Sequence, residues 1–325
     1  GGTIGNGVSF VTTDTVAKVS VPQKEYTLLN SWSGCSSSYE RVLPQPLGQS
    51  VGAVVGDNLY NFGGFDNNFE YIEDTYYSNI TMKSSFGSLA DMPSPTSAAC
   101  TVTVGTKVYI MGGLTTNSTV TDAVFMYNTV DNSWTTLQPM NRARFAPACA
   151  YYNGKIYVFA GQSAGFGPDY NSTEIYDIDS NTWTDSDAQL SNTSHWLSAA
   201  YINVADRNLA IIMGGSEGWP VAVRDNLDVY DMDLDEIILR TNLLRPRYAF
   251  NAITLSHLDF GSRLVLMAGG KNQENEAVGA INAISCSEPT ASPTTEDEAQ
   301  DQSEGSMKKA GFMFMFMIVS FFVIL

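Results

Sequence analysis

Histidine is nearly absent from this sequence, which has only His195 and His257 among 325 residues. Histidine is the commonest general base and a frequent metal ligand, so its scarcity argues against most acid–base and metal-dependent enzymes. We expect both histidines in surface or loop positions. The sequence also lacks a nucleophile elbow, a zinc-protease motif and a phosphate-binding glycine loop. It therefore predicts no catalytic residue, no cofactor and no metal site.

Basic residues are also scarce, with 17 Lys and Arg against 34 Asp and Glu and a formal net charge of −17. A field of this sign repels phosphate backbones, so we expect no nucleic-acid partner. The four cysteines, Cys35, Cys100, Cys149 and Cys286, lack the spacing of a zinc site.

The sequence begins without a methionine or an apolar leader run, and we expect a longer gene product to carry a signal peptide upstream. Four Asn-X-Ser/Thr sites are candidates for N-glycosylation. Together with an apolar C-terminal segment they predict a secretory route to the extracellular face of the cell surface, where cysteines can be oxidised. These sites are Asn79, Asn117, Asn171 and Asn192.

What the sequence does contain is a repeat. Five apolar runs each end in a pair of small residues, and the second glycines of successive pairs are 49, 48, 54 and 55 residues apart. This period suits one four-stranded sheet per repeat. A glycine pair is expected where a second strand ends and a Cβ atom would clash. The glycines are Gly63, Gly64, Gly112, Gly113, Gly161, Gly214, Gly215, Gly269 and Gly270, with Ala160 in place of one first glycine.

Aromatic residues recur at equivalent positions of the same repeat. Three tyrosines each precede a bulky apolar residue by seven positions, with an Asp/Asn/Ser turn between the two. This spacing predicts a hairpin whose aromatic side chains fill the wedge between adjacent sheets. The pairs are Tyr127 with Trp134, Tyr176 with Trp183, and Tyr230 with Ile237.

A glycine pair, a tyrosine and a tryptophan seven residues later, repeated about every fifty residues, resemble the kelch repeat family. The resemblance covers roughly residues 1–286. It implies an all-β fold, a kelch-type β-propeller of four-stranded blades, that binds a protein or glycan partner. Six blades are favoured, and five is the alternative if strands from both ends share a blade. Cys35 and Cys286 would then lie near the seam, either as a disulfide or as two unrelated thiols.

The kelch family also includes an enzyme branch resembling galactose oxidase, which holds copper with histidines, tyrosines and a cysteine. The residue types occur here, but not in that branch's contexts. We therefore expect a non-catalytic binding module, with an extracellular oxidase or other enzyme as the alternative.

Residues before the first strands, and tryptophans outside the repeat, are candidates for a ligand-contacting rim, because loops from several blades converge there. The alternative for the arginines is pairing with neighbouring carboxylates. The candidates are Arg142, Arg144, Arg245, Arg247, Trp196 and Trp219.

The C-terminal part has a different composition. Residues 287–306 are acidic and contain Ser, Thr and Pro, which predicts a disordered stalk. Residues 307–325 end in fourteen uncharged residues, fewer than the roughly 20 of a spanning helix. This segment resembles a glycosylphosphatidylinositol attachment signal. Ser303 is the candidate lipid-attachment site, with Gly305 and Ser306 as alternative sites, and the alternative to a lipid signal is a short transmembrane segment. Both place the protein at a membrane.

Overall fold

The computed structural model describes residues 2–4, 8–10, 13–20, 36–79, 85–163, 167–204, 206–218, 221–255, 263–278, 281–286 and 319–322. Within this part of the chain the fold is all-β, and its only helix is the short 3-10 helix η1 (Thr116–Ser118). The strands are β1 Gly2–Ile4, β2 Val8–Phe10, β3 Thr13–Ser20, β4 Ser36–Leu47, β5 Val51–Val55, β6 Asn58–Phe62, β7 Thr75–Asn79, β8 Gly87–Ser88, β9 Cys100–Val104, β10 Lys107–Met111, β11 Leu114–Thr115, β12 Thr119–Val120, β13 Val124–Asn128, β14 Ser133–Thr136, β15 Ala148–Tyr152, β16 Lys155–Phe159, β17 Thr173–Asp177, β18 Thr182–Asp185, β19 Ser198–Val204, β20 Arg207–Met213, β21 Ser216–Glu217, β22 Ala222–Val223, β23 Asn226–Asp231, β24 Glu236–Asn242, β25 Asn251–Leu255, β26 Arg263–Ala268, β27 Ile281–Cys286 and β28 Val319–Phe322.

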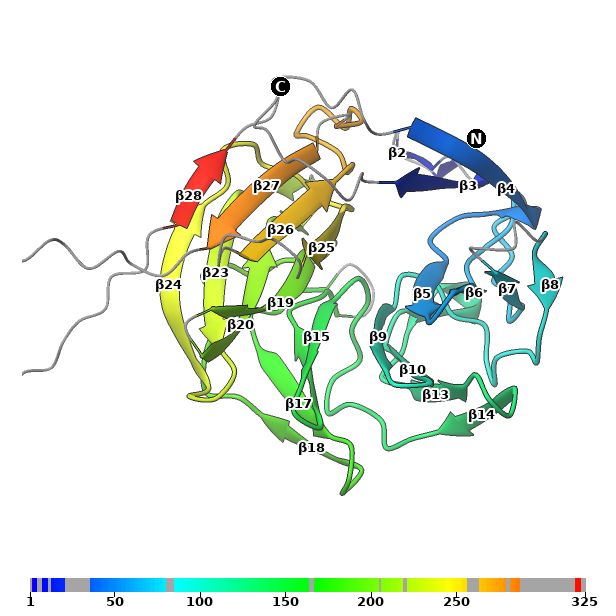
Figure 1. Cartoon of the computed structure of the whole chain (residues 1–325), viewed down its shortest axis with the longest axis horizontal. Coiled ribbons are helices and arrows are strands. Elements are labelled where there is room, and N and C mark those ends of the chain that lie inside the picture. The colour runs from blue at the N-terminus through cyan, green and yellow to red at the C-terminus, as the bar shows by residue number, and fades with distance from the viewer. Residues whose placement is uncertain are drawn as a thin grey trace, which may run out of the picture.

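Five antiparallel four-stranded sheets form the body of the molecule. Blade I consists of β5–β8, blade II of β9, β10, β13 and β14, blade III of β15–β18, blade IV of β19, β20, β23 and β24, and blade V of β25–β28. The blades stand around a ring, with the first strand of each blade near the centre and the fourth at the periphery (Figure 1). The predicted all-β propeller of four-stranded blades is confirmed.

The two ends of the described chain do not share a sheet. The N-terminal strands pair among themselves, β1 with β2 and β3 with β4. The β3–β4 hairpin lies in the ring between blade I and blade V (Figure 1). In blade V the fourth strand is β28, which pairs with β27.

The core lies between blades rather than inside one blade. The second strands carry nearly continuous buried apolar residues, as in β10 and β16, because both faces of each sheet are covered by neighbours. The fourth strands β14 and β18 are mostly exposed. Four apolar clusters each combine residues of two adjacent blades, so a single blade cannot bury its own faces.

The glycine pairs sit where one blade passes the chain segment that leads into the next. The Gly113 N–H donates to the Arg144 carbonyl at 2.9 Å, and the Gly64 N–H donates to the Thr96 carbonyl at 2.8 Å. A Cβ atom on Gly112 would lie 2.4 Å from the Arg144 carbonyl oxygen. This close approach gives the physical reason for glycine at that position.

Candidate partner-binding end of the propeller

One end of the propeller gathers two kinds of connection: the segments that enter each first strand, and the loops that follow each glycine pair. Isolated β-bridges join them in the same way in successive blades. We call this the loop end. The bridges include Ser97 with Leu114, Phe145 with Gln162, His195 with Ser216, and Tyr248 with Lys271.

A chain of backbone hydrogen bonds runs from blade to blade at the loop end. The Ala98 N–H donates to the Gln49 carbonyl at 2.9 Å, the Ala146 N–H to Ala98 at 2.7 Å, the Trp196 N–H to Ala146 at 2.9 Å, and the Ala249 N–H to Trp196 at 2.8 Å. All five residues have φ between 50 and 56°, the left-handed region. Equivalent residues of five connections are thus fixed relative to one another.

Trp196 is the one large side chain at this repeated position, where the other four residues are three alanines and a glutamine. Its ring is half-buried and contacts Phe145 edge-on, with 6.1 Å between the ring centroids. Phe145 in turn lies 5.6 Å from the His195 ring. The structure therefore places the rim candidate Trp196 in an aromatic cluster at the loop end.

His195 lies in the segment that enters the first strand of blade IV, a loop position as expected, but it is buried there, with 6% of its surface exposed. His257 lies outside the described residues. The His195 Nδ1 atom lies 3.0 Å from Asp169 Oδ1, and its Nε2 atom lies 3.5 Å from Ser216 Oγ. This order of groups is that of a serine-hydrolase triad. Because Ser216 is fully buried, its hydroxyl is closed to a substrate carbonyl, and the three residues connect the loops of blades III and IV.

Asp169 also fixes the backbone of the next loop, since the Gly218 N–H donates to Asp169 Oδ2 at 2.8 Å. The loop from Ser216 onward is thereby held against blade III. Trp219, the second tryptophan candidate, lies outside the described residues.

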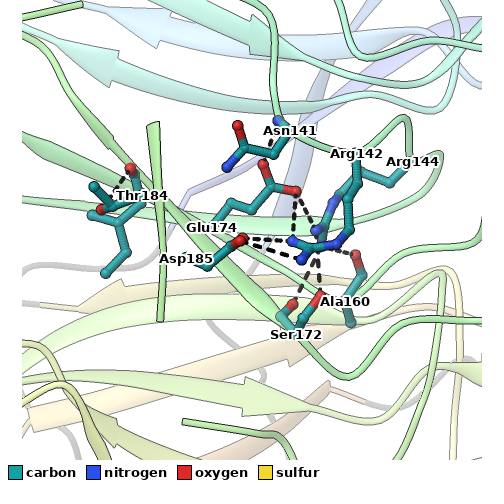
Figure 2. Close-up of polar contacts among 9 residues, drawn as sticks. Asn141, Arg142, Arg144, Ala160, Ser172, Glu174, Thr184 and Asp185 are labelled. Atoms are coloured by element: carbon teal, nitrogen blue, oxygen red, sulfur yellow. Dashed lines mark hydrogen bonds and ion pairs between the residues drawn. The ribbon is translucent and has the colours of Figure 1, made fainter. Parts of the chain in front are cut away.

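Arg144 is fully buried, which does not fit a rim side chain that a ligand reaches. Figure 2 shows its guanidinium group between Glu174 and the backbone of blade III. Arg144 Nη2 lies 2.5 Å from Glu174 Oε1, and Nη1 donates to the Ala160 carbonyl at 2.6 Å. Burial lowers the pKa of Arg144, and the Glu174 carboxylate opposes that shift. The pairing alternative describes this residue.

Arg142 pairs at the surface with Asp185, with Nη1 2.5 Å from Oδ1 (Figure 2). This hydrogen bond lowers the pKa of the Asp185 carboxyl group. Arg247 is fully buried at the position equivalent to Arg144, and its Nη1 donates to the Gly269 carbonyl at 3.3 Å. Arg245 is exposed and is the candidate arginine that stays open to a ligand.

Among the candidate glycosylation sites, Asn117 is exposed in η1 at the loop end. Asn79, Asn171 and Asn192 are partly buried, and the Asn79 side chain donates to Asn58 Oδ1 at 3.0 Å. Glycosylation at these positions stays a prediction.

Two of the remaining sequence-derived sites, Cys35 and Ser303, lie outside the described residues. Cys286 ends β27 opposite Arg263, and its pairing with Cys35 stays a prediction. In the described part of the chain no group of three or more His, Cys, Asp or Glu residues is arranged to hold a metal ion. Within those same residues no helix is long and apolar enough to cross a membrane.

The ring of left-handed residues was missed in the sequence, although a signal for it was present. Gln49, Ala98 and Ala146 each precede the second glycine of their repeat by the same distance, 15 residues. In blade IV the first two strands, β19 and β20, have seven residues each instead of five, and in blade V the connection between β25 and β26 is longer. Trp196 and Ala249 therefore depart from this spacing, and their equivalence becomes visible only in the structure.

Comparisons with known proteins agree with this architecture. The family model of the KLHDC2/KLHL20/DRC7 Kelch-repeats domain matches residues 26–215 and, in a second placement, residues 90–254. An F-box/kelch-repeat protein of Arabidopsis thaliana is 30% identical over 175 residues, which cover 53% of this chain and 43% of that protein. Kelch-like protein 23 of Homo sapiens is 30% identical over 141 residues, covering 42% of this chain and 24% of its own length. The chain thus spans less than half of these curated relatives.

Among solved structures, YjhT superposes with a TM-score of 0.62 at 15% sequence identity, covering 75% of this chain and 83% of YjhT. At this identity the likeness concerns the fold alone.

Proposed function

Because this chain belongs to the kelch-repeat family, we propose that it is a non-catalytic binding module whose loop end engages a protein partner. The position of Trp196 at the loop end is the main observation that supports this proposal. A partly exposed tryptophan held on a rigid backbone is the kind of side chain that dominates protein interfaces, since it buries a large area at little cost in conformational entropy. A glycan in place of a protein is an outcome of the test below.

Trp196→Ala tests this role, with Val130→Ser as a matched control. Val130 is 72% exposed in the turn between β13 and β14, away from the loop end. We expect the immobilised Trp196→Ala chain to capture about tenfold less, or even less, of the proteins that the wild-type chain captures. The Val130→Ser chain should capture the same amount as the wild-type chain. Equal capture by both variants contradicts the proposal, and selective binding of the wild-type chain to a glycan array favours the glycan.

We infer that the chain is not an enzyme, and the geometry around His195 supports this. Its Nδ1 atom faces Asp169, and the Ser216 hydroxyl is buried beside it, so neither group meets a substrate. Copper analysis of the purified chain tests the oxidase alternative. Stoichiometric copper, together with an oxidase activity that His195→Ala abolishes, would overturn this inference.

We propose further that the protein is held at the extracellular face of a membrane by a C-terminal lipid anchor. The acidic composition of residues 287–306 and the short apolar run that ends the sequence support this proposal. The negatively charged segment would extend by self-repulsion and keep the propeller away from the bilayer.

Phospholipase treatment of intact cells tests the anchor. We expect release of the protein into the medium. Mass spectrometry should show that the released chain has its C-terminal residue at or near Ser303. A chain that keeps its C-terminal apolar peptide and stays with the cells would reject the lipid anchor and favour the short transmembrane segment.

Six blades are our proposal for the ring, with the β3–β4 hairpin as part of the sixth. Its position between blade I and blade V supports this count (Figure 1). The apolar cluster that joins Leu43 and Leu47 of β4 to Tyr76 and Phe86 of blade I also supports it.

A further inference from the structure

Cys100 and Cys149 meet between blades II and III. Cys100 begins β9 and Cys149 is the second residue of β15, so each lies on the innermost strand of its blade. Both contribute to the apolar cluster between these two blades, with Cys100 buried and Cys149 partly buried. The Cys100 thiol lies near enough to the Cys149 thiol to help raise the pKa of Cys149. The pair plays no part in the loop end.

The strand registers explain why these two side chains face each other. Cys100 lies opposite Met111, the last residue before the glycine pair of blade II. The equivalent residue of blade III is Ala148, which lies opposite Phe159, and Cys149 is one position further along. Because successive side chains of a strand point to opposite faces, Cys100 and Cys149 project from the two sheet faces that pack together.

The same pair of positions is in contact at another blade interface. Between blades IV and V the equivalent residues are Ser198 and Ala252, and the Ala252 N–H donates to Ser198 Oγ at 3.0 Å. Just upstream of the cysteines, the backbones of blades II and III are joined by the bond from the Ala146 N–H to the Ala98 carbonyl, at 2.7 Å. The backbones of blades II and III are thus held together directly beside the two cysteines, and a disulfide requires closely approaching strands of this kind.

We propose that Cys100 and Cys149 form a disulfide that joins blades II and III when the protein folds in the presence of a small-molecule disulfide such as oxidised glutathione. One cysteine thiolate attacks oxidised glutathione, which forms a mixed disulfide and releases one glutathione thiolate. The second cysteine thiolate then attacks the protein sulfur of the mixed disulfide and releases the other. Two protein thiols are oxidised, one glutathione disulfide is reduced to two thiols, and the two protein protons pass to the released thiolates.

The environment of the pair places this reaction during folding rather than after it. Burial raises the pKa of the Cys149 thiol, and the nearby Cys100 thiol raises it further. Exchange requires a thiolate and access to the oxidant, and both are more available before blades II and III close over the pair.

The test uses the full chain with Cys35→Ser and Cys286→Ser, so that only this pair can react. The denatured, reduced chain is refolded in a glutathione redox buffer and digested without reduction for mass spectrometry. We expect one linked peptide pair containing Cys100 and Cys149, lighter than the two reduced peptides by two hydrogen atoms. We also expect a melting temperature several degrees higher than that of the same chain treated with dithiothreitol.

Two matched variants separate this geometry from chance pairing. In Cys149→Ser with Ala148→Cys the second thiol moves to the opposite sheet face, and we expect no linked peptide. In Cys100→Ala with Cys149→Ala we expect a folded chain whose melting temperature does not respond to dithiothreitol. The proposal is overturned if a refolded chain with native circular dichroism, denatured afterwards without reductant, is alkylated at both cysteines. Separate glutathione adducts on each cysteine, or equal cross-linking of the face-shifted variant, overturn it as well.

Discussion

Buried charged residues lie at the junctions between neighbouring blades. Arg144 belongs to the segment entering blade III, yet its guanidinium group binds the Glu174 carboxylate on the third strand of that blade, while its carbonyl accepts the Gly113 N–H of blade II. The motif containing this arginine could be recognised in the sequence. Its burial could not be predicted, because the sequence shows that a residue is charged but not whether it is buried. The partly exposed Arg142 and the exposed Arg245 have the same local context.

Glu174→Gln should destabilise the fold strongly. The substitution keeps the shape of the side chain but leaves the Arg144 guanidinium group buried without its counter-charge, which typically costs about 3–5 kcal/mol. Asp185→Asn is the matched control, because it removes the exposed partner of Arg142 and should cost less than about 1 kcal/mol. Urea unfolding of both variants measures the difference, and equal losses of stability would contradict the buried-pair interpretation.

Gly112→Ala should also destabilise the fold, by about 2 kcal/mol or more, because its Cβ atom would meet the Arg144 carbonyl oxygen at 2.4 Å. Gly154→Ala separates this clash from backbone strain. Gly154 likewise has a positive φ, of 77°, but nothing lies within 4 Å of its Cβ position, so we expect a loss of only about 1 kcal/mol. Guanidinium unfolding curves compare the two variants, and similar midpoints would argue against the steric explanation.

At the scale of the element, the hairpin between the third and fourth strands is the most regular unit. Tyr127 lies opposite Trp134, and its hydroxyl donates to Asn132 Oδ1 in the turn at 2.8 Å. The Trp134 indole N–H donates to the Ala90 carbonyl of blade I at 2.9 Å. The seven-residue spacing predicted the hairpin, because cross-strand partners have fixed separations. It did not reveal the bond to Ala90, which depends on how blades meet.

The tyrosines of these hairpins should make the protein sensitive to alkali. Burial raises the pKa values of Tyr127 and Tyr176 to about 12, above the value near 10 of an unfolded phenol. Below pH 10 both states keep the proton, and between about pH 10 and 12 only the unfolded state loses it. Stability should therefore fall across that range, by up to about 2–3 kcal/mol for each tyrosine.

Urea unfolding midpoints measured between pH 9 and pH 12, with tyrosinate absorbance followed in parallel, check this expectation. The double substitution Tyr127→Phe with Tyr176→Phe should flatten the pH dependence while lowering stability at pH 9, because the bonds to Asn132 and Asn181 are lost. An unchanged slope in the double variant would show that other groups control alkaline unfolding.

For the whole molecule, the kelch propeller could be predicted because the glycine pairs and the aromatic hairpins recur with the same period in several blades. The arrangement of the first and last strands in the ring could not be predicted, because β3–β4 and blade V lack a complete set of these signals. The loop end could be anticipated only as a rim. Its organisation depends on backbone bonds between blades, such as the one from Trp196 to Ala146.

Deletion of residues 303–325 should leave the propeller folded, with a melting temperature within a few degrees of the full chain. This deletion removes β28, the outermost strand of blade V, whereas the apolar cluster between blades IV and V is built from residues such as Val265, Met267 and Ile284 further inside. A larger deletion of residues 281–325 also removes β27 with the buried Ile284, and we expect it to abolish cooperative unfolding because blade V loses part of this core. Differential scanning calorimetry of the two truncated chains measures whether each one still unfolds cooperatively. Loss of the folded state already in the shorter deletion would show that β28 is integral to the ring, and would count against a C-terminal segment removed during anchoring.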